Sequence, residues 1–179
     1  MKILFADTTH PALPEQLAAA GFEIEQSRCK TKEECLAIID QYEGVIIRSK
    51  FIIDEELLAK ATKLKFIGRV GAGMENIDVK AAESRGIKCF NSPEGNRNAV
   101  GEHALGMLLA LQNNLLRANV EVSRGQWRRE ANRGIELKNK TIGIVGFGNT
   151  GSAFAKKLSG MEMRILAFDK YKTNYAPDY

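Results

Sequence analysis

Short apolar runs alternate with amphipathic stretches from residue 2 to residue 90. The runs are rich in Ile, Val and Phe, as is typical of strands buried in a parallel sheet, and lie at 2–6, 22–26, 45–48, 65–70 and 87–90. Between them, apolar residues recur at helical spacing, with charged residues on the other face, over 14–20, 32–41, 54–61 and 79–85. This alternation predicts βαβ units, and five such strands predict an α/β fold with a flavodoxin-like parallel sheet.

The pattern changes after residue 90. Residues 91–98 contain Pro93 and Gly95 among polar neighbours, which predicts a loop, and Asn98 is suited to cap a following helix. Apolar residues then recur every three or four positions from Val100 to Ala118, which predicts one long connecting helix over 98–120. Residues 123–140 are polar and show no period. We therefore expect a domain boundary between residues 97 and 98.

A second α/β unit follows, with strands expected at 141–145 and 164–168 and a helix at 152–158. A doubly wound sheet needs several more strands to cover its helices. We therefore interpret 98–179 as the first part of a Rossmann domain, cut short at the end of the chain, and 1–97 as a separate domain.

The strongest chemical motif is a glycine-rich loop, Gly-x-Gly-x-x-Gly. It directly follows the strand at 141–145 and opens a helix, and Asp169 ends the next strand, which is the context of a dinucleotide-binding fingerprint. Its six residues are Gly146, Phe147, Gly148, Asn149, Thr150 and Gly151.

Each part of this loop has a physical task. Gly146 permits the tight turn, Gly148 lets the pyrophosphate approach the backbone, and Gly151 lets the helix pack on the strand. The N–H groups at the helix start favour phosphate. Asp169 would accept hydrogen bonds from ribose hydroxyls and repel a 2′-phosphate, which favours NAD over NADP. The alternative is a structural glycine turn with a solvated aspartate.

Two other strand ends are candidate anion sites. The turn Gly71-Ala72-Gly73 follows the strand at 65–70, and consecutive N–H groups in such a turn can form an anion nest. Arg48 and Ser49 end another strand at the same expected edge, where an arginine can hold a carboxylate or phosphate bidentately. The alternatives are an ordinary βα turn and a surface charge.

Composition narrows the class of protein. The 179 residues are 44% hydrophobic and 27% charged, which is ordinary for a soluble globular chain. No apolar run approaches the roughly 18 residues of a membrane span, and the N-terminus has the pattern of a strand rather than a signal peptide, so we expect a cytoplasmic protein. Three cysteines without a CxxC pair and two histidines argue against a disulfide framework and a metal site. The formal net charge of +4 is matched by the excess within 124–140, so nucleic acid is not an expected partner.

The motifs together resemble the D-isomer-specific 2-hydroxyacid dehydrogenase family over nearly the whole chain. The likeness is carried by GRVGAGMENIDVKAAESRGIKCFNSPEGNRNAVGEHALGMLLAL, by the Gly-x-Trp at 125–127 and by TIGIVGFGNTGSAFAKKL. The resemblance implies a substrate domain that a returning C-terminal segment completes, an inserted NAD domain, and an active site in the cleft between them. It also implies NAD-dependent oxidation of a D-2-hydroxyacid, with 3-phosphoglycerate, a precursor of serine, as the first candidate and glyoxylate- or lactate-type acids as alternatives.

The resemblance also assigns roles to residues. It implies that the backbone of the 71–73 turn binds the substrate carboxylate, with Ala72 near the cofactor, and that Asn149 and Thr150 contact the pyrophosphate. It places the basic stretch around Trp127 in a dimer contact, so we expect a homodimer or tetramer. The remaining implied substrate residues are Arg48, Ser49 and Asn96.

The family's catalytic residues are an Arg, a Glu and a His, and none has a matching position here. In the family all three lie in later parts of the NAD domain, so the resemblance places them beyond the end of this chain. We assign His103 to helix packing and His10 to an exposed loop. We therefore expect the 179 residues alone to be inactive. The alternatives are a non-catalytic NAD-responsive binding protein and an inactive fragment. The sequence departs from the family at Asn149, where many relatives carry Arg, and at Gly101, where Ala is usual.

Overall fold

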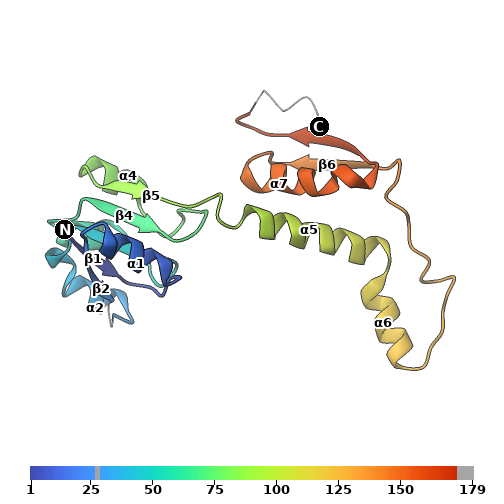
Figure 1. Ribbon diagram of the computed structural model, residues 1–179, viewed down its shortest axis with the longest axis horizontal. Helices are drawn as coiled ribbons and strands as arrows, with labels where there is room; N and C mark the ends of the chain where they lie inside the picture. The colour runs from blue at the N-terminus through green and yellow to red at the C-terminus, as the bar shows by residue number, and fades with distance from the viewer. Residues whose placement is uncertain (27–28, 173–179) are drawn as a thin grey trace. The chain divides into compact units, whose positions relative to one another are not determined.

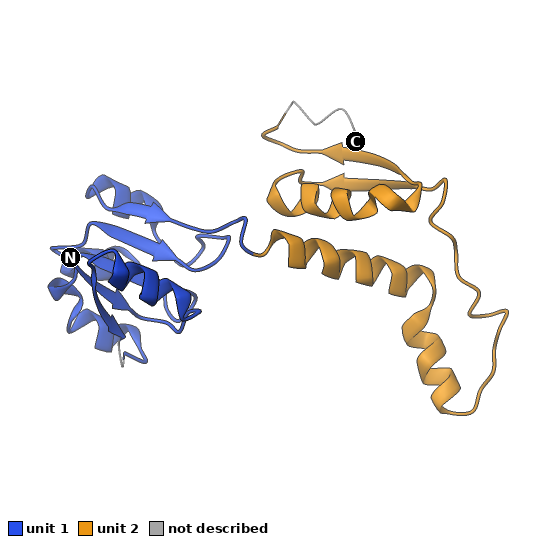
Figure 2. Ribbon diagram, viewed as in Figure 1, with its two compact units in different colours: residues 1–95 blue, residues 96–179 orange. Residues whose placement is uncertain are grey.

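The computed structural model describes residues 1–26 and 29–172. The chain divides into two compact units, 1–95 and 96–179 (Figure 2). No helix in these described ranges is long and apolar enough to cross a bilayer. The division falls after Gly95.

Unit 1 contains a five-stranded parallel sheet in the order β2-β1-β3-β4-β5 (Figure 1). Its strands are β1 (Lys2–Phe5), β2 (Glu23–Gln26), β3 (Gly44–Ile47), β4 (Phe66–Arg69) and β5 (Lys88–Phe90). In register, Leu4 lies opposite Val45, and Val45 opposite Ile67. The predicted α/β class and flavodoxin-like strand order are confirmed, and all five carboxyl ends lie along one edge.

The helices of unit 1 are α1 (Ala12–Ala19), α2 (Lys32–Leu36), α3 (Glu55–Lys60) and α4 (Val79–Ser84), with a 3-10 turn η1 (Ile39–Gln41). The helix predicted over 32–41 is therefore α2 followed by η1. The chain leaves the α-helical path at Ile38, whose φ is −130°. Ile39 and Tyr42 are buried in the core after this change of direction.

Alternate strand residues bury their side chains on opposite faces of the sheet. Leu4, Val45 and Ile67 belong to the larger core, whereas Ile3 and Ile46 belong to a smaller core on the other face. All five are buried. Near-continuous apolar strands are the sequence consequence of a sheet covered on both faces.

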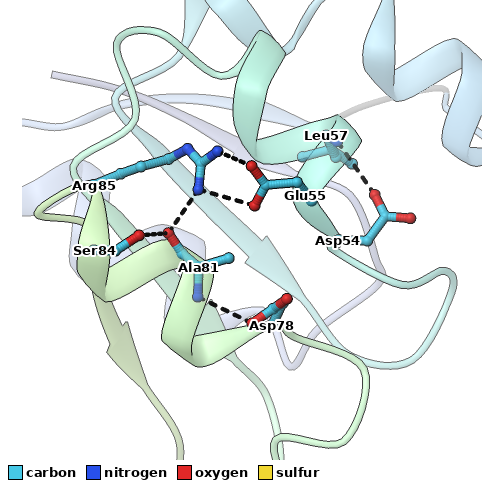
Figure 3. Close-up of polar contacts among 7 residues, drawn as sticks. All are labelled: Asp54, Glu55, Leu57, Asp78, Ala81, Ser84 and Arg85. Atoms are coloured by element: carbon cyan, nitrogen blue, oxygen red, sulfur yellow. Dashed lines mark hydrogen bonds and ion pairs between the residues drawn. The ribbon is translucent and has the colours of Figure 1, made fainter.

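Polar contacts join α3 to α4 beside the sheet (Figure 3). The side chains of Asp54 and Asp78 cap the two helices by accepting hydrogen bonds from first-turn backbone N–H groups at 3.2 and 3.0 Å. At the end of α4, the Arg85 guanidinium donates to both carboxylate oxygens of Glu55 at the start of α3. These bonds fix the two helices that follow β3 and β4.

Unit 2 contains α5 (Arg97–Gln112), α6 (Leu115–Ser123), β6 (Thr141–Val145), α7 (Asn149–Leu158), a 3-10 turn η2 (Ser159–Met161) and β7 (Arg164–Phe168). β6 and β7 pair in parallel, and α7 packs against α5 (Figure 1). Both predicted strands have the observed bounds, and α7 begins three residues earlier than expected.

The single helix predicted over 98–120 is wrong, because the structure has two helices there. The helix is interrupted at Asn114, whose φ of 51° lies in the left-handed region that asparagine tolerates better than most residues. The Leu109 carbonyl accepts both the backbone N–H and the side-chain amide of Asn113, each at 3.0 Å. The first helix begins at Arg97, so its N-cap is Asn96 rather than the expected Asn98.

Gly101 lies where α5 packs against α7. A Cβ added there would lie 3.1 to 3.2 Å from backbone atoms of Ala153 and Phe154. Near this contact, the Lys157 ammonium pairs with the Glu102 carboxylate at 2.9 Å. An alanine at residue 101 would therefore crowd the backbone of α7, which explains why glycine fits this position in this chain.

Candidate functional site

The glycine-rich loop lies at the carboxyl end of β6 and forms the N-terminus of α7, with Gly148 as the N-cap. Gly146 has a φ of +91°, which a side chain rarely adopts. A Cβ on Gly151 would lie 2.0 Å from the Gly146 carbonyl oxygen, whereas a Cβ on Gly148 would meet nothing within 4 Å. Gly146 thus forms the tight turn, Gly148 leaves space for a ligand to approach the backbone, and Gly151 allows close packing, as the motif predicts.

The neighbouring loop residues present backbone rather than side chains. Phe147 is buried with Ile144 and Ala155, so its ring is a core residue of unit 2. Asn149 and Thr150 are the exposed first residues of α7. Their N–H groups lie in the first turn of the helix, where donors have no partner within the helix. An anion at this loop would therefore meet backbone N–H groups first.

Asp169 follows β7 and lies beside the glycine-rich loop. Its Oδ2 accepts a hydrogen bond from the Phe147 N–H at 2.7 Å, and its Oδ1 accepts from the N–H groups of Tyr171 and Lys172 at 2.8 and 3.1 Å. The hydrogen bond from Tyr171 contributes most to lowering the pKa of Asp169. Together with the other two backbone bonds it outweighs the effect of burial. The carboxylate is therefore ionised at neutral pH. Its bond to the loop was not foreseen, because it depends on how β6 and β7 pair.

Asp7 anchors the turn that contains Arg48 and Ser49. It follows β1, and its Oδ2 accepts hydrogen bonds from the N–H groups of Arg48, Ser49 and Lys50 at 2.9, 3.0 and 3.1 Å. Sequence reasoning missed Asp7, although an acidic residue directly after a first strand was a signal. Because Asp7 occupies these three donors, only the exposed side chains of Arg48 and Ser49 are available for a ligand.

The Lys50 ammonium donates to the Cys29 carbonyl at 3.1 Å. A cavity of about 590 Å³ opens on this side, and its lining includes Asp7, Thr8 and Lys50. The predicted substrate residues do not line it.

The Asp7 anchor makes the stability of unit 1 depend on pH. Burial raises the pKa of Asp7, but the three N–H bonds and the charge of Lys50 outweigh burial and leave the pKa below the ordinary 3.8. Because the pKa is lower in the folded state, the ionised Asp7 stabilises the fold at any pH above the ordinary pKa. This stabilisation is lost as the pH falls through the folded-state pKa.

We therefore expect Asp7→Asn to lower the free energy of unfolding by about 1 kcal/mol at neutral pH, because asparagine keeps an acceptor but loses the charge. The difference from the wild type should shrink as the pH falls below 3.8, which urea unfolding at several pH values measures. A difference that stays constant through this range would show that the Asp7 charge does not stabilise the turn.

The turn Gly71-Ala72-Gly73 lies beside the Arg48 turn. β3 and β4 are neighbours with Ile47 opposite Arg69, and the Val70 N–H donates to the Ile47 carbonyl at 2.8 Å. The two turns are thus adjacent at the carboxyl edge, as expected. Arg69, which sequence reasoning did not single out, folds back so that a Cβ on Gly71 would collide with its guanidinium.

The remaining candidates lie apart from these turns in the chain. Asn96 is exposed at the start of α5, and its side chain makes no capping hydrogen bond. His103 is exposed on α5, which differs from the helix-packing role expected for it, and His10 is exposed as predicted. Within the described ranges, no group of three potential ligand side chains could hold a metal ion.

Comparison with known proteins gives one consistent result. Residues 3–176 match the model of the D-isomer specific 2-hydroxyacid dehydrogenase family, catalytic domain. The chain is 36% identical to D-3-phosphoglycerate dehydrogenase of Archaeoglobus fulgidus over 96% of its own length and 32% of that protein. It is 37% identical to hydroxypyruvate reductase of Thermotoga maritima over 79% of its own length and 46% of that protein.

A solved structure agrees with these sequence matches. The apo-structure of D-lactate dehydrogenase from Escherichia coli superposes with a TM-score of 0.71 at 29% identity, covering 97% of this chain and 56% of that one. The chain thus spans about a third of the length of the Archaeoglobus relative and about half of this structure. The matching family consists of dehydrogenases that act on CH–OH groups with NAD(P)(H). Because the family model matches nearly the whole chain, the protein belongs to the D-isomer-specific 2-hydroxyacid dehydrogenase family.

Proposed function

We propose that this chain supplies the substrate-binding edge and the first part of the cofactor site of an NAD-dependent D-2-hydroxyacid dehydrogenase. Unit 1 then acts as the substrate domain, and unit 2 is part of the NAD-binding domain. The single observation that carries the proposal is the glycine-rich loop with Asp169 bonded to it, because its geometry fits a pyrophosphate and a ribose at the same end of β6 and β7.

NAD is the proposed cofactor. The Gly146–Gly151 loop would hold the pyrophosphate by its N–H groups, and the ionised Asp169 would bind the ribose hydroxyls and repel a 2′-phosphate. When bound, nicotinamide supplies the acceptor for the hydride that leaves C2 of the acid. The proton of the same hydroxyl needs a base, which we assign to a segment outside these 179 residues. For that reason we propose that the chain alone does not turn over.

The proposed substrate is a D-2-hydroxyacid with a second acidic group, and 3-phosphoglycerate fits best. The substrate carboxylate would bind the backbone of Gly71–Gly73, with Ala72 toward the cofactor. Arg48, Ser49 and Arg69 lie at the ends of the neighbouring strands, and two of these are cations suited to a phosphate. Asn96 is the proposed loop contact to the same substrate. The similarity to D-3-phosphoglycerate dehydrogenase supports this choice, and hydroxypyruvate and D-lactate are the alternatives to test.

The partner that we propose is a second copy of this chain. Helices α5 and α6 and the segment after them expose large apolar side chains, including Trp127, which is 81% exposed. Aromatic and aliphatic side chains with arginine neighbours are typical of interface centres. The exposed set is Val100, Met107, Leu111, Leu115, Leu116, Val120, Val122, Trp127 and Ile135.

We expect the gene product that contains these residues to form NADH from 3-phosphoglycerate, and Arg48→Ala to raise its KM at least about tenfold with little change in kcat. The reason is that Arg48 presents an exposed guanidinium at the proposed substrate edge. Lys50→Ala is the matched control, because that ammonium bonds the Cys29 carbonyl instead. An unchanged KM in Arg48→Ala would remove this role. No NADH with any tested D-2-hydroxyacid would remove the dehydrogenase activity, and NAD binding without turnover would favour a binding protein.

A further inference from the structure

Two successive carbonyl groups of the 71–73 turn are held by the residues that follow β5. The Ser92 N–H donates to the Gly71 carbonyl at 2.8 Å. The Asn91 side-chain amide donates to the Ala72 carbonyl at 2.6 Å. Both donors come from one side of the turn, because β5 is the neighbour of β4 in the sheet.

This anchoring fixes where the turn's N–H groups point. In a trans peptide, the C=O and the following N–H lie antiparallel in one plane. The Ala72 N–H therefore points away from Ser92, and the Gly73 N–H points away from Asn91. Within residues 1–26 and 29–172, neither of these N–H groups donates a hydrogen bond. Two adjacent N–H groups without a partner are the elements of an anion nest.

The charges around the turn favour an anion on the Gly71 side. The Arg69 guanidinium lies against Gly71, and its buried Nε has no hydrogen-bond partner. The Glu75 carboxylate lies near Gly73 but is exposed, so its side chain can turn toward solvent. A buried cationic group without an acceptor is costly, which a bound anion would relieve.

We infer that Asn91 is a positioning residue, whose side-chain amide holds the Ala72 carbonyl so that the N–H groups of Ala72 and Gly73 face the carboxylate of the acid. This inference rests on the proposed role of the turn in carboxylate binding. The Ser92 bond uses backbone that any residue but proline supplies, whereas the Asn91 bond needs a side-chain donor. Aspartate at this position would lack the donor and place a carboxylate against a carbonyl.

The test is a titration of the 179-residue chain with 3-phosphoglycerate, followed by ¹⁵N NMR of the backbone amides. In the wild type we expect the Ala72 and Gly73 signals to shift with ligand concentration. Asn91→Ala and Asn91→Asp should each raise the Kd for 3-phosphoglycerate at least about tenfold, because the turn is no longer held in the binding geometry. Asn91 is exposed, so both variants are expected to fold, which thermal unfolding checks.

Asn76→Ala is the matched control. Asn76 lies in the same unit, and its side-chain amide donates to the Phe51 carbonyl at 3.3 Å rather than to the turn. We expect this variant to lose a similar bond and keep its Kd. Binding at Ala72 and Gly73 that is equally strong without Asn91 would overturn the positioning role and leave the proposed function intact. The absence of any shift at these two amides in the wild type would overturn the carboxylate role of the turn, and the inference with it.

Discussion

Replacing Gly151 with alanine is expected to destabilise unit 2 by about 3 kcal/mol. The added Cβ would lie 2.0 Å from the Gly146 carbonyl oxygen and 3.0 Å from its carbon, and both are backbone atoms that cannot rotate away. Helix α7 would have to move off β6, which disturbs its packing against α5. Urea unfolding followed by circular dichroism measures the loss.

Gly148→Ala is the matched variant for this prediction. Gly148 has a φ of −81°, and an added Cβ would meet nothing within 4 Å, so we expect the free energy of unfolding to change by less than about 0.5 kcal/mol. The methyl group would instead occupy the proposed approach of the pyrophosphate, so the Kd for NAD should rise at least about tenfold. Equal stability of the two variants would contradict the close packing at Gly151, and unchanged NAD binding by Gly148→Ala would contradict the pyrophosphate role.

Replacing Asp169 should change the choice between NAD and NADP. We expect Asp169→Ala to weaken NAD binding and to reduce the ratio of the two dissociation constants about tenfold or more, because the ribose acceptor and the repulsive charge are both removed. Isothermal titration of the protein with each dinucleotide measures this ratio. Since hydrogen bonds hold the pKa of Asp169 below its ordinary value, Asp169 stays charged between pH 6 and 8 and adds no pH dependence of its own to this ratio.

Asp169→Asn separates the two functions of this side chain. The asparagine oxygen can still accept a hydrogen bond from the Phe147 N–H, so support of the glycine-rich loop is kept while the charge is lost. Its amide nitrogen cannot accept from the Tyr171 and Lys172 N–H groups, so we expect a modest loss of stability together with lost discrimination against NADP. Discrimination that survives both substitutions would show that the ribose role is wrong.

The fold of unit 1 and the glycine-rich loop were predictable because their signals are local. Buried parallel strands show as apolar runs, and the loop's three glycines occupy positions fixed by one turn and one helix start. The break at Asn114 was hidden because the apolar period runs through it, from Leu111 to Leu115 and Ala118. A single left-handed residue changes the helix direction without changing the side-chain pattern.

The anchoring residues of the candidate site could not be predicted in the same way. Asp7 bonds a turn 41 to 43 residues later in the chain, which requires that β1 and β3 be neighbours. Asn91 bonds Ala72, 19 residues earlier, from the end of the next strand. Such contacts depend on sheet order and register, which residue spacing alone does not specify.

The two turns at the carboxyl edge of unit 1 differ in what is left for a ligand. Asp7 accepts hydrogen bonds from the N–H groups of the Arg48 turn, whereas no described residue accepts one from the N–H groups of Ala72 and Gly73. Under the proposed function, backbone N–H groups therefore bind the carboxylate that all 2-hydroxyacids share. Side chains bind the substituent that differs from one acid to another. Evolution could then exchange one acid for another through substitutions near Arg48, without losing the carboxylate recognition on which every such substrate depends.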